Sequence, residues 1–173
     1  LELNNRPGYS RKYVPGKGDT LYRRSLYTFW KRTVLSPMMK TFDAPEREFC
    51  TVNRSRTNTP LQALLLLQGP QFVEAARKLA ERILMDGGIT RESRIRYGFE
   101  LVTSRQPTDE EAEILSRFQT QQAVHFKDHP QAAEKILSVG ASRRNLELNP
   151  IELAAWTEWA RLLLNLDETI NRD

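Results

Sequence analysis

The C-terminal part of the chain carries the pattern that most restricts its fold. Residues 151–166 are apolar on most of the circumference of a helix, and the polar positions form one narrow stripe. This stripe consists of Glu158, Arg161, Asn165 and Glu168. Asn149 is a suitable N-cap and Pro150 suits the first helical position, because proline has no N–H group to lose there. Since a helix that is apolar nearly all round is buried among its neighbours, we expect this helix at the centre of a bundle.

The residues before this helix predict the rest of the bundle. A short apolar helix starts at Thr59-Pro60, is expected to be buried, and ends at Gly69-Pro70. Apolar spacing and capping signals predict three longer helices: residues 72–83 before Asp86-Gly87-Gly88, residues 95–102 before Pro107, and one opened by the capping box of Thr108 and Glu111. A shorter helix begins at His129-Pro130 and ends near Gly140. The sequence therefore predicts an all-α (mainly α) fold, an irregular bundle of about five to six helices over residues 59–173.

The sequence predicts that residues 1–58, before the helical bundle, form an extended, basic and aromatic-rich arm with connecting loops. The first 60 residues carry twelve Lys and Arg against five Asp and Glu, a balance of +7, whereas residues 61–173 carry fourteen against seventeen, a balance of −3. Such an asymmetry indicates an anionic partner or electrostatic docking of the basic segment. The arm is predicted to be irregular up to residue 20, and the pattern of residues 21–35 leaves a short helix and a strand both open. Residues 36–45 predict a loop with one helical turn at Met38-Met39.

The composition excludes several kinds of site. The longest strongly apolar run, residues 64–67, is far shorter than the about 20 residues that span a bilayer. Cys50 is the only cysteine, which excludes an internal disulfide and any Cys-x-x-Cys site for a metal or a haem within the chain. The chain begins with neither an initiator Met nor a signal-peptide pattern, so we expect a piece from the C-terminal end of a larger protein.

Motifs with a known catalytic mechanism are missing from the sequence. It contains no Gly-x-Ser-x-Gly elbow, no Gly-rich phosphate loop and no dinucleotide-binding fingerprint. The carboxylates of residues 109–113 fall at a helix start, where negative charge is favourable without a catalytic role. His125 and His129 have a spacing that can bind a metal ion, but no Glu is placed as in His-Glu-x-x-His, and Pro130 indicates a helix break. We therefore interpret both histidines as surface residues and predict no metal site and no catalytic residue.

Residues 42–60 hold a cluster of charged residues that no helix start explains. The candidate binding site consists of Asp43, Arg47, Arg54, Arg56 and Asn58. Together with N–H groups at the start of the next helix, its three arginines could cradle a carboxylate, sulfate or phosphate. In the alternative interpretation, these arginines bond to loop carbonyl groups and pair with Asp43, Glu46 and Glu48, which would stabilise an irregular connection. Both interpretations remain open at the level of the sequence.

Five stretches of the chain resemble one protein family. They are RRSLYTFWKRT at residues 23–33, FDAP at 42–45, RTNTPLQAL at 56–64, and LAAW at 153–156 followed by LLNLDE at 163–168. In this order they resemble the C-terminal domain of unknown function of planctomycete proteins that are exported, cytochrome-c-like and built of several domains. The resemblance implies an extracytoplasmic (periplasmic or secreted) location and a haem c in the upstream part of the parent protein, with no cofactor in this chain. It assigns no catalytic residue.

Three functions follow as expectations. The first is a non-catalytic C-terminal module that docks onto the upstream domains of the same polypeptide through Arg24, Tyr27, Trp30 and Arg32, so that the chain alone is not an enzyme. The second is a composite active or binding site for an anionic polymer or polysaccharide, to which the arginine-rich loop contributes. The third is nucleic-acid binding by the basic arm. We do not expect this third function, because no nucleic-acid motif is present and export would remove the partner.

Overall fold

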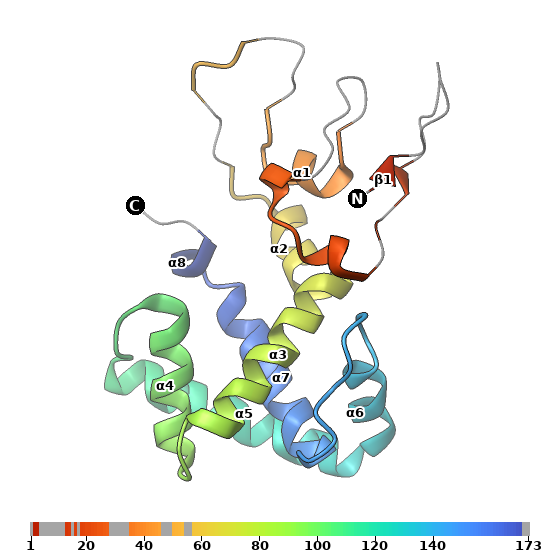
Figure 1. Cartoon of the computed structure of the whole chain (residues 1–173). Helices are drawn as coiled ribbons and strands as arrows, with labels where there is room; N and C mark the ends of the chain where they lie inside the picture. Colours follow the sequence, from red (N-terminus) through yellow and green to blue (C-terminus); the bar gives the residue numbers. More distant parts are fainter. Residues whose placement is uncertain are drawn as a thin grey trace. The chain divides into compact units, whose positions relative to one another are not determined.

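The chain divides into two compact units, Leu1–Gln62 and Ala63–Asp173. The structure, a computed structural model, describes residues 2–3, 13–14, 16, 18–27, 35–45, 50–53 and 57–170. These residues form eight α-helices, two 3₁₀-helices and one pair of two-residue strands (Figure 1). The predicted mainly α-helical class is therefore confirmed.

The described residues of the N-terminal unit form short elements. Strand β1 (Glu2–Leu3) pairs antiparallel with β2 (Tyr13–Val14), in a segment for which the sequence predicted only irregular structure. Strands of two residues are too short to show the alternation of apolar and polar residues by which a strand is recognised in a sequence. The 3₁₀-helices η1 (Gly18–Tyr22) and η2 (Ser25–Tyr27) follow, and α1 (Pro37–Thr41) confirms the helical turn predicted at Met38-Met39.

Helix α2 (Pro60–Gln68) begins in the N-terminal unit and continues into the C-terminal one. Its predicted start at Pro60 is confirmed, but its predicted burial is wrong: Leu61 is 61% and Leu64 is 49% exposed. Burial requires neighbours, and no described element packs extensively along α2. A run of leucines thus indicated the helix correctly without indicating what covers it.

The C-terminal unit is a bundle of α-helices around one central helix. Its members are α3 (Pro70–Asp86), α4 (Arg91–Thr103), α5 (Asp109–Asp128), α6 (Pro130–Leu137), α7 (Pro150–Leu164) and the short α8 (Asp167–Ile170). Helix α7 contacts each of the five others, most extensively α3 and α5 (Figure 1). The predicted central position of the apolar C-terminal helix is confirmed.

The bundle core is filled by aromatic and aliphatic side chains from all the longer helices. Trp156 and Trp159 of α7 are fully buried and meet edge to face, with ring centroids 5.2 Å apart. The indole N–H of Trp159 donates a 3.2 Å hydrogen bond to the carbonyl oxygen of Leu115 on α5, which satisfies its one polar group. Helix α4 approaches the same ring through Gly98, where a Cβ atom would lie 2.8 Å from Trp159 Cζ3.

Capping contacts confirm three of the predicted helix ends. The last predicted helix, expected to run to residue 166, is interrupted instead: α7 ends at Leu164 and α8 begins at Asp167. The side chains of Thr108 and Glu111 form the reciprocal capping box at the start of α5. Asn149 Oδ1 accepts hydrogen bonds from the first N–H groups of α7. Gly87 follows the end of α3, as predicted from the Gly-Gly pair.

Candidate functional site

The candidate anion site lies only partly within the described residues. Arg47, Arg54 and Arg56 are outside them, whereas Asp43 and Asn58 are described. Asp43 has a left-handed backbone conformation, with φ 55°, after helix α1. Its Oδ2 atom accepts hydrogen bonds from the backbone N–H of Thr57 at 2.8 Å and from the Thr57 hydroxyl at 2.7 Å. The Asp43 carboxylate thus joins the loop before α2 to the end of α1.

The start of α2 is closed by its own side chains. Oε1 of Gln62 accepts the Thr59 N–H at 2.8 Å, and the Thr59 hydroxyl oxygen accepts the Gln62 N–H at 3.3 Å, which together make a capping box. The buried Gln62 amide also donates to the Thr41 carbonyl oxygen at 2.8 Å and to the Thr57 hydroxyl at 3.0 Å. The sequence contained this signal as Thr59-x-x-Gln62, but only the N-cap was predicted.

These contacts favour the structural interpretation for the described part of the candidate anion site. The N–H groups of Thr57, Thr59 and Gln62 all donate to side chains of this same unit. A bound anion would have to displace those acceptors or use other donors. For the three arginines the anion site stays a prediction.

The predicted docking face is also described in part. Trp30 and Arg32 lie outside the described residues, whereas Arg24 and Tyr27 are exposed. The apolar side chains around Arg24 are exposed as well: 59% for Tyr22, 78% for Leu26 and 68% for Tyr27. Residues 22–27 therefore present aromatic, aliphatic and cationic groups on one short segment of the N-terminal unit.

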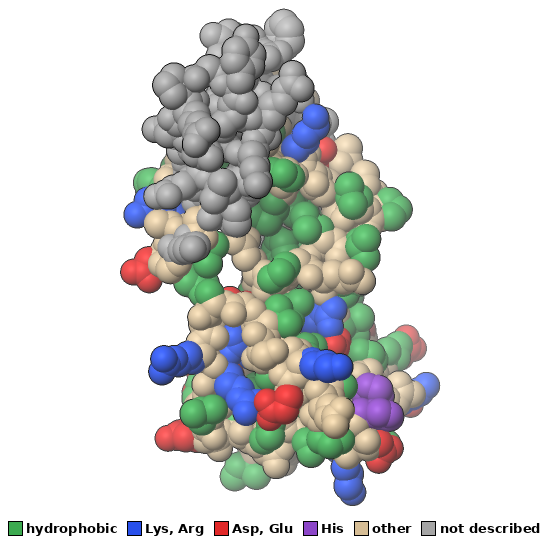
Figure 2. Space-filling model, turned by 90° about the vertical axis from the view of Figure 1, so that its right-hand side faces the viewer, with side chains coloured by type: hydrophobic (Ala, Val, Ile, Leu, Met, Phe, Trp, Pro, Cys, Tyr) green, Lys and Arg blue, Asp and Glu red, His purple; other side chains and the backbone are tan. Residues whose placement is uncertain are grey.

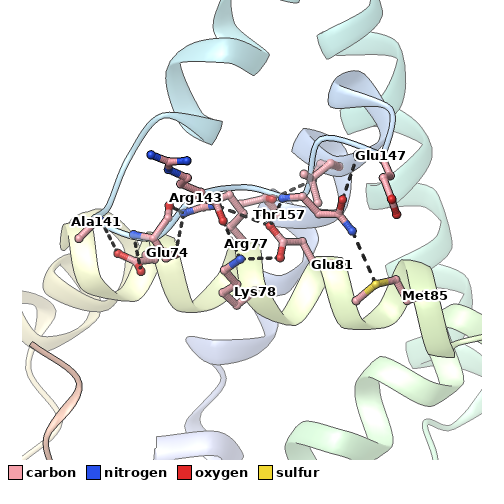
Figure 3. A network of polar contacts seen from close by, with 12 residues as sticks. Glu74, Arg77, Lys78, Glu81, Met85, Ala141, Arg143, Glu147 and Thr157 are labelled. Atoms are coloured by element: carbon pink, nitrogen blue, oxygen red, sulfur yellow. Dashed lines mark hydrogen bonds and ion pairs between the residues drawn. The ribbon is translucent and has the colours of Figure 1, made fainter. Parts of the chain in front are cut away.

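A cluster of buried charges that the sequence analysis missed lies on α3. Figure 3 shows acidic and basic side chains of α3 meeting the loop of residues 138–149, which connects α6 to α7. Glu74 Oε2 accepts the Ala141 N–H at 2.7 Å, and Oε1 accepts the Ser142 N–H at 3.1 Å. The preceding Gly140 has φ 102°, and a Cβ atom there would lie 2.3 Å from Glu74 Oε2. The turn around the carboxylate therefore requires glycine.

Arg77 and Glu81 continue this contact along α3. Arg77 is only 1% exposed, and its Nη2 donates to the carbonyl oxygen of Ser142 at 2.8 Å and to the Ser142 hydroxyl at 3.1 Å. Glu81 accepts from Lys78 Nζ at 2.7 Å and from the Asn145 N–H at 3.1 Å, and it pairs with Arg77 at 3.5 Å.

The α3 cluster is electrically balanced. Glu74 and Glu81 offset the charges of Arg77 and Lys78, and Lys78 Nζ also donates to the Arg143 carbonyl oxygen at 2.8 Å. Nearly all the bonds to the loop go to main-chain atoms, so the cluster holds the course of the backbone. We interpret it as structural, because its groups bind the protein itself. The sequence signal was a polar face of α3 that resembles a solvated one.

A second ionic cluster centres on Arg105, after α4. Its guanidinium bonds to both oxygens of Glu111 at 2.7 and 2.8 Å and to both oxygens of Glu168 on α8 at 2.8 Å, and it lies 4.8 Å from the centre of the Phe99 ring. The hydrogen bonds from Arg105, followed by that from the Thr108 N–H, lower the pKa of Glu111 to about 2. The same bonds, first to Glu111 and then to Glu168, raise the pKa of Arg105. The cluster attaches α8 to the corner between α4 and α5.

The two histidines lie close together at the C-terminal end of α5. Both are exposed, and their rings stack with centroids 4.8 Å apart. His129 Nδ1 is 3.0 Å from the carbonyl oxygen of His125. Within the described ranges, no group of three or more His, Cys, Asp or Glu residues is placed to hold a metal ion. Similarly, the described helices include none that could cross a membrane.

Comparison with known proteins identifies a family. No curated protein and no solved structure matches the chain significantly. A family described as PSD1, protein of unknown function (DUF1553), matches residues 3–119. The match includes the N-terminal unit and runs into α5, so α6 and α7 lie beyond it. Because more than half of the chain is matched, the chain belongs to the PSD1 (DUF1553) family of proteins of unknown function.

Proposed function

We propose that the chain is a non-catalytic helical module that docks onto upstream domains of the same polypeptide through its N-terminal unit. The parent protein in this proposal is exported and carries a haem c upstream. The resemblance of the sequence motifs to planctomycete proteins of that kind supports this parentage. The family match supports membership of a family whose biochemical role is unassigned.

The observation that carries the docking proposal is the exposure of residues 22–27. Tyr22, Leu26 and Tyr27 each expose more than half of their surface, and Arg23 and Arg24 lie among them. Exposed aromatic side chains next to arginines are typical of the energetically dominant residues of protein interfaces. A partner surface with an apolar centre and carboxylates around it would match them.

The ionic clusters of the C-terminal unit offer little to a substrate. The two clusters, around Arg77 and around Arg105, bind groups of the bundle itself. Because the charges of these two clusters are paired inside the bundle, they support docking over catalysis by the bundle.

The test measures binding of the chain to the upstream domains of the parent protein, supplied as a separate polypeptide in isothermal titration calorimetry. Tyr27→Ala is expected to weaken binding by about 1–2 kcal/mol, or roughly five- to thirtyfold, as for an interface aromatic residue. Arg24→Glu is expected to weaken it further at low salt than at high salt, because exposed charges are screened.

The matched control is Lys135→Glu, which makes the same charge change at an exposed site on α6. It should leave the affinity nearly unchanged. Equal losses for Arg24→Glu and Lys135→Glu would show that only net charge matters. Full binding by Tyr27→Ala would exclude residues 22–27 as the docking segment.

A further inference from the structure

The pair His125 and His129 has a geometry that the sequence could not show. Their spacing of four residues was interpreted as two surface residues, because Pro130 indicated a helix break. The break is present, but His129 is the C-cap residue of α5, and its backbone N–H still donates to the His125 carbonyl oxygen at 2.9 Å. Both imidazoles therefore lie on the same side of the final turn, and Figure 2 shows the histidine side chains together on the surface.

We propose that His125 and His129 form a two-imidazole binding site for a divalent first-row transition metal ion and that Cu²⁺ is the ion bound most tightly. Imidazole nitrogen is a preferred ligand of Ni²⁺, Cu²⁺ and Zn²⁺, and among these three ions the affinity is highest for Cu²⁺. Metal–nitrogen bonds of about 2 Å require the two coordinating nitrogens to come within roughly 4 Å of each other. The rings are stacked, with centroids 4.8 Å apart and 26° between their planes, so their lone pairs run nearly parallel. Binding one ion therefore requires a change of side-chain rotamer, which the exposure of both histidines permits.

The hydrogen bond of His129 is compatible with metal binding by this ring. A carbonyl oxygen can only accept, so the 3.0 Å contact with the His125 oxygen places the hydrogen on Nδ1 of His129. In the neutral ring this leaves the lone pair on Nε2. A ring N–H that donates to a backbone carbonyl is the usual partner arrangement of a metal-binding histidine. The ring does not cap α6, so Nε2 has no such competing role.

The surroundings also favour a cation. The pair lies at the C-terminal end of α5, where the helix dipole and the last carbonyl groups provide partial negative charge. Lys127 and Asp128, in the same turn of the chain, have opposite charges, and Arg117, which lines a surface hollow together with His125, is paired with Glu113 at 3.0 Å. Because no third protein ligand is grouped with the pair among the described residues, water would complete the coordination. The site would therefore bind an exchangeable metal ion rather than a permanent structural one.

The test is a Cu²⁺ titration of the whole chain in a Cys50→Ser background, which removes the single exposed thiol. The chain contains only two histidines, so every imidazole signal comes from this pair. We expect one Cu²⁺ per chain, with two coordinated nitrogens in the electron paramagnetic resonance spectrum. His125→Ala and His129→Ala should each weaken binding by about a hundredfold, because the second ligand acts intramolecularly.

Two controls separate this site from unspecific copper binding and from loss of fold. Lys127→Ala changes the same turn without removing an imidazole, and this variant should bind Cu²⁺ with the same affinity as the chain that carries only Cys50→Ser. Circular dichroism melting should show that the two alanine variants remain folded, and His125→Gln replaces His125→Ala if the latter unfolds. Unchanged affinity in either histidine variant, or a copper spectrum with a single nitrogen, overturns the proposal.

Discussion

Replacing Glu74 by glutamine tests the role of the buried charges on α3. The Glu74 carboxylate accepts two N–H groups of the α6–α7 loop, at 2.7 Å from Ala141 and 3.1 Å from Ser142. A glutamine of the same size keeps one acceptor oxygen and turns an NH₂ group toward the other N–H. The variant therefore loses one charge-assisted hydrogen bond and leaves one partly buried N–H group facing another donor. It also leaves Arg77 and Lys78 with one carboxylate instead of two.

The expected loss follows from these contacts. A hydrogen bond to a charged group contributes about 1.5–3 kcal/mol, and an unsatisfied donor that is only partly buried costs a further about 1 kcal/mol, the lower end of the range for buried donors. The relief of burying one charge fewer offsets part of this loss. We therefore expect Glu74→Gln to lower the free energy of unfolding by about 2 kcal/mol. With an m-value of about 1–2 kcal/mol per molar urea, the unfolding midpoint should fall by roughly 1–2 M.

The assay follows tryptophan fluorescence during urea unfolding. Trp156 and Trp159 are buried in the bundle, and Trp30→Phe removes the third tryptophan, so that the signal reports the C-terminal unit alone. Amide hydrogen exchange at Ala141 and Ser142 should also become faster in the variant, because one of these two N–H groups loses its acceptor and the other keeps only an uncharged one.

The control is Glu113→Gln, which removes an exposed carboxylate paired with Arg117 at 3.0 Å. Such a surface pair contributes at most about 1 kcal/mol, so the midpoint should hardly move. An equal shift for Glu74→Gln and Glu113→Gln would refute the claim that α3 holds the loop through its buried charges.

Three further predictions follow from other contacts. Gly98→Ala should destabilise the bundle by about 1–2 kcal/mol in the same assay, because a Cβ atom would lie 2.7 Å from Ile83 Cδ1 and 2.8 Å from the buried Trp159 ring, which outweighs the helix propensity of alanine; a stabilised variant would contradict this. Since bonds from Arg105 lower the pKa of Glu111 to about 2, the stabilisation from this carboxylate is complete above about pH 4.5 and is lost as the pH falls toward 2. The gap in unfolding midpoint between the parent and Glu111→Gln should therefore narrow on acidification, and a constant gap would exclude the ionic contribution. Finally, the chain should not retard a labelled single-stranded oligonucleotide in gel electrophoresis at low salt. A retardation that disappears as the salt concentration rises would support the nucleic-acid alternative instead.

The helix positions were predictable because their signals are local. The Asn149 cap, the Thr108 and Glu111 capping box, and the Gly87-Gly88 pair each act within a few residues of a helix end. Burial of α7 was predictable because a helix with almost no polar face has nowhere else to lie. Leu163 and Trp156 are indeed fully buried.

The candidate sites were less accessible to sequence reasoning. Asp43 could be selected by residue type and placement, but the hydrogen bonds that it accepts from Thr57 show that its carboxylate is used inside the chain. The pair of histidines was visible as a spacing, while the side of the turn that each ring occupies depends on the backbone at His129. Residue types indicate what a group can do, whereas geometry decides what it contacts.

By itself, the sequence determined that a helical bundle forms, where its capped helix ends lie and which helix lies at the centre. The tertiary structure alone decided that α2 leaves Leu61 and Leu64 exposed, and that the polar face of α3 is covered by a loop. The bond from Arg77 to Ser142 joins residues 65 positions apart. Helix and cap signals act over a few residues of sequence, whereas the burial of a charge depends on which distant segment returns to neutralise it.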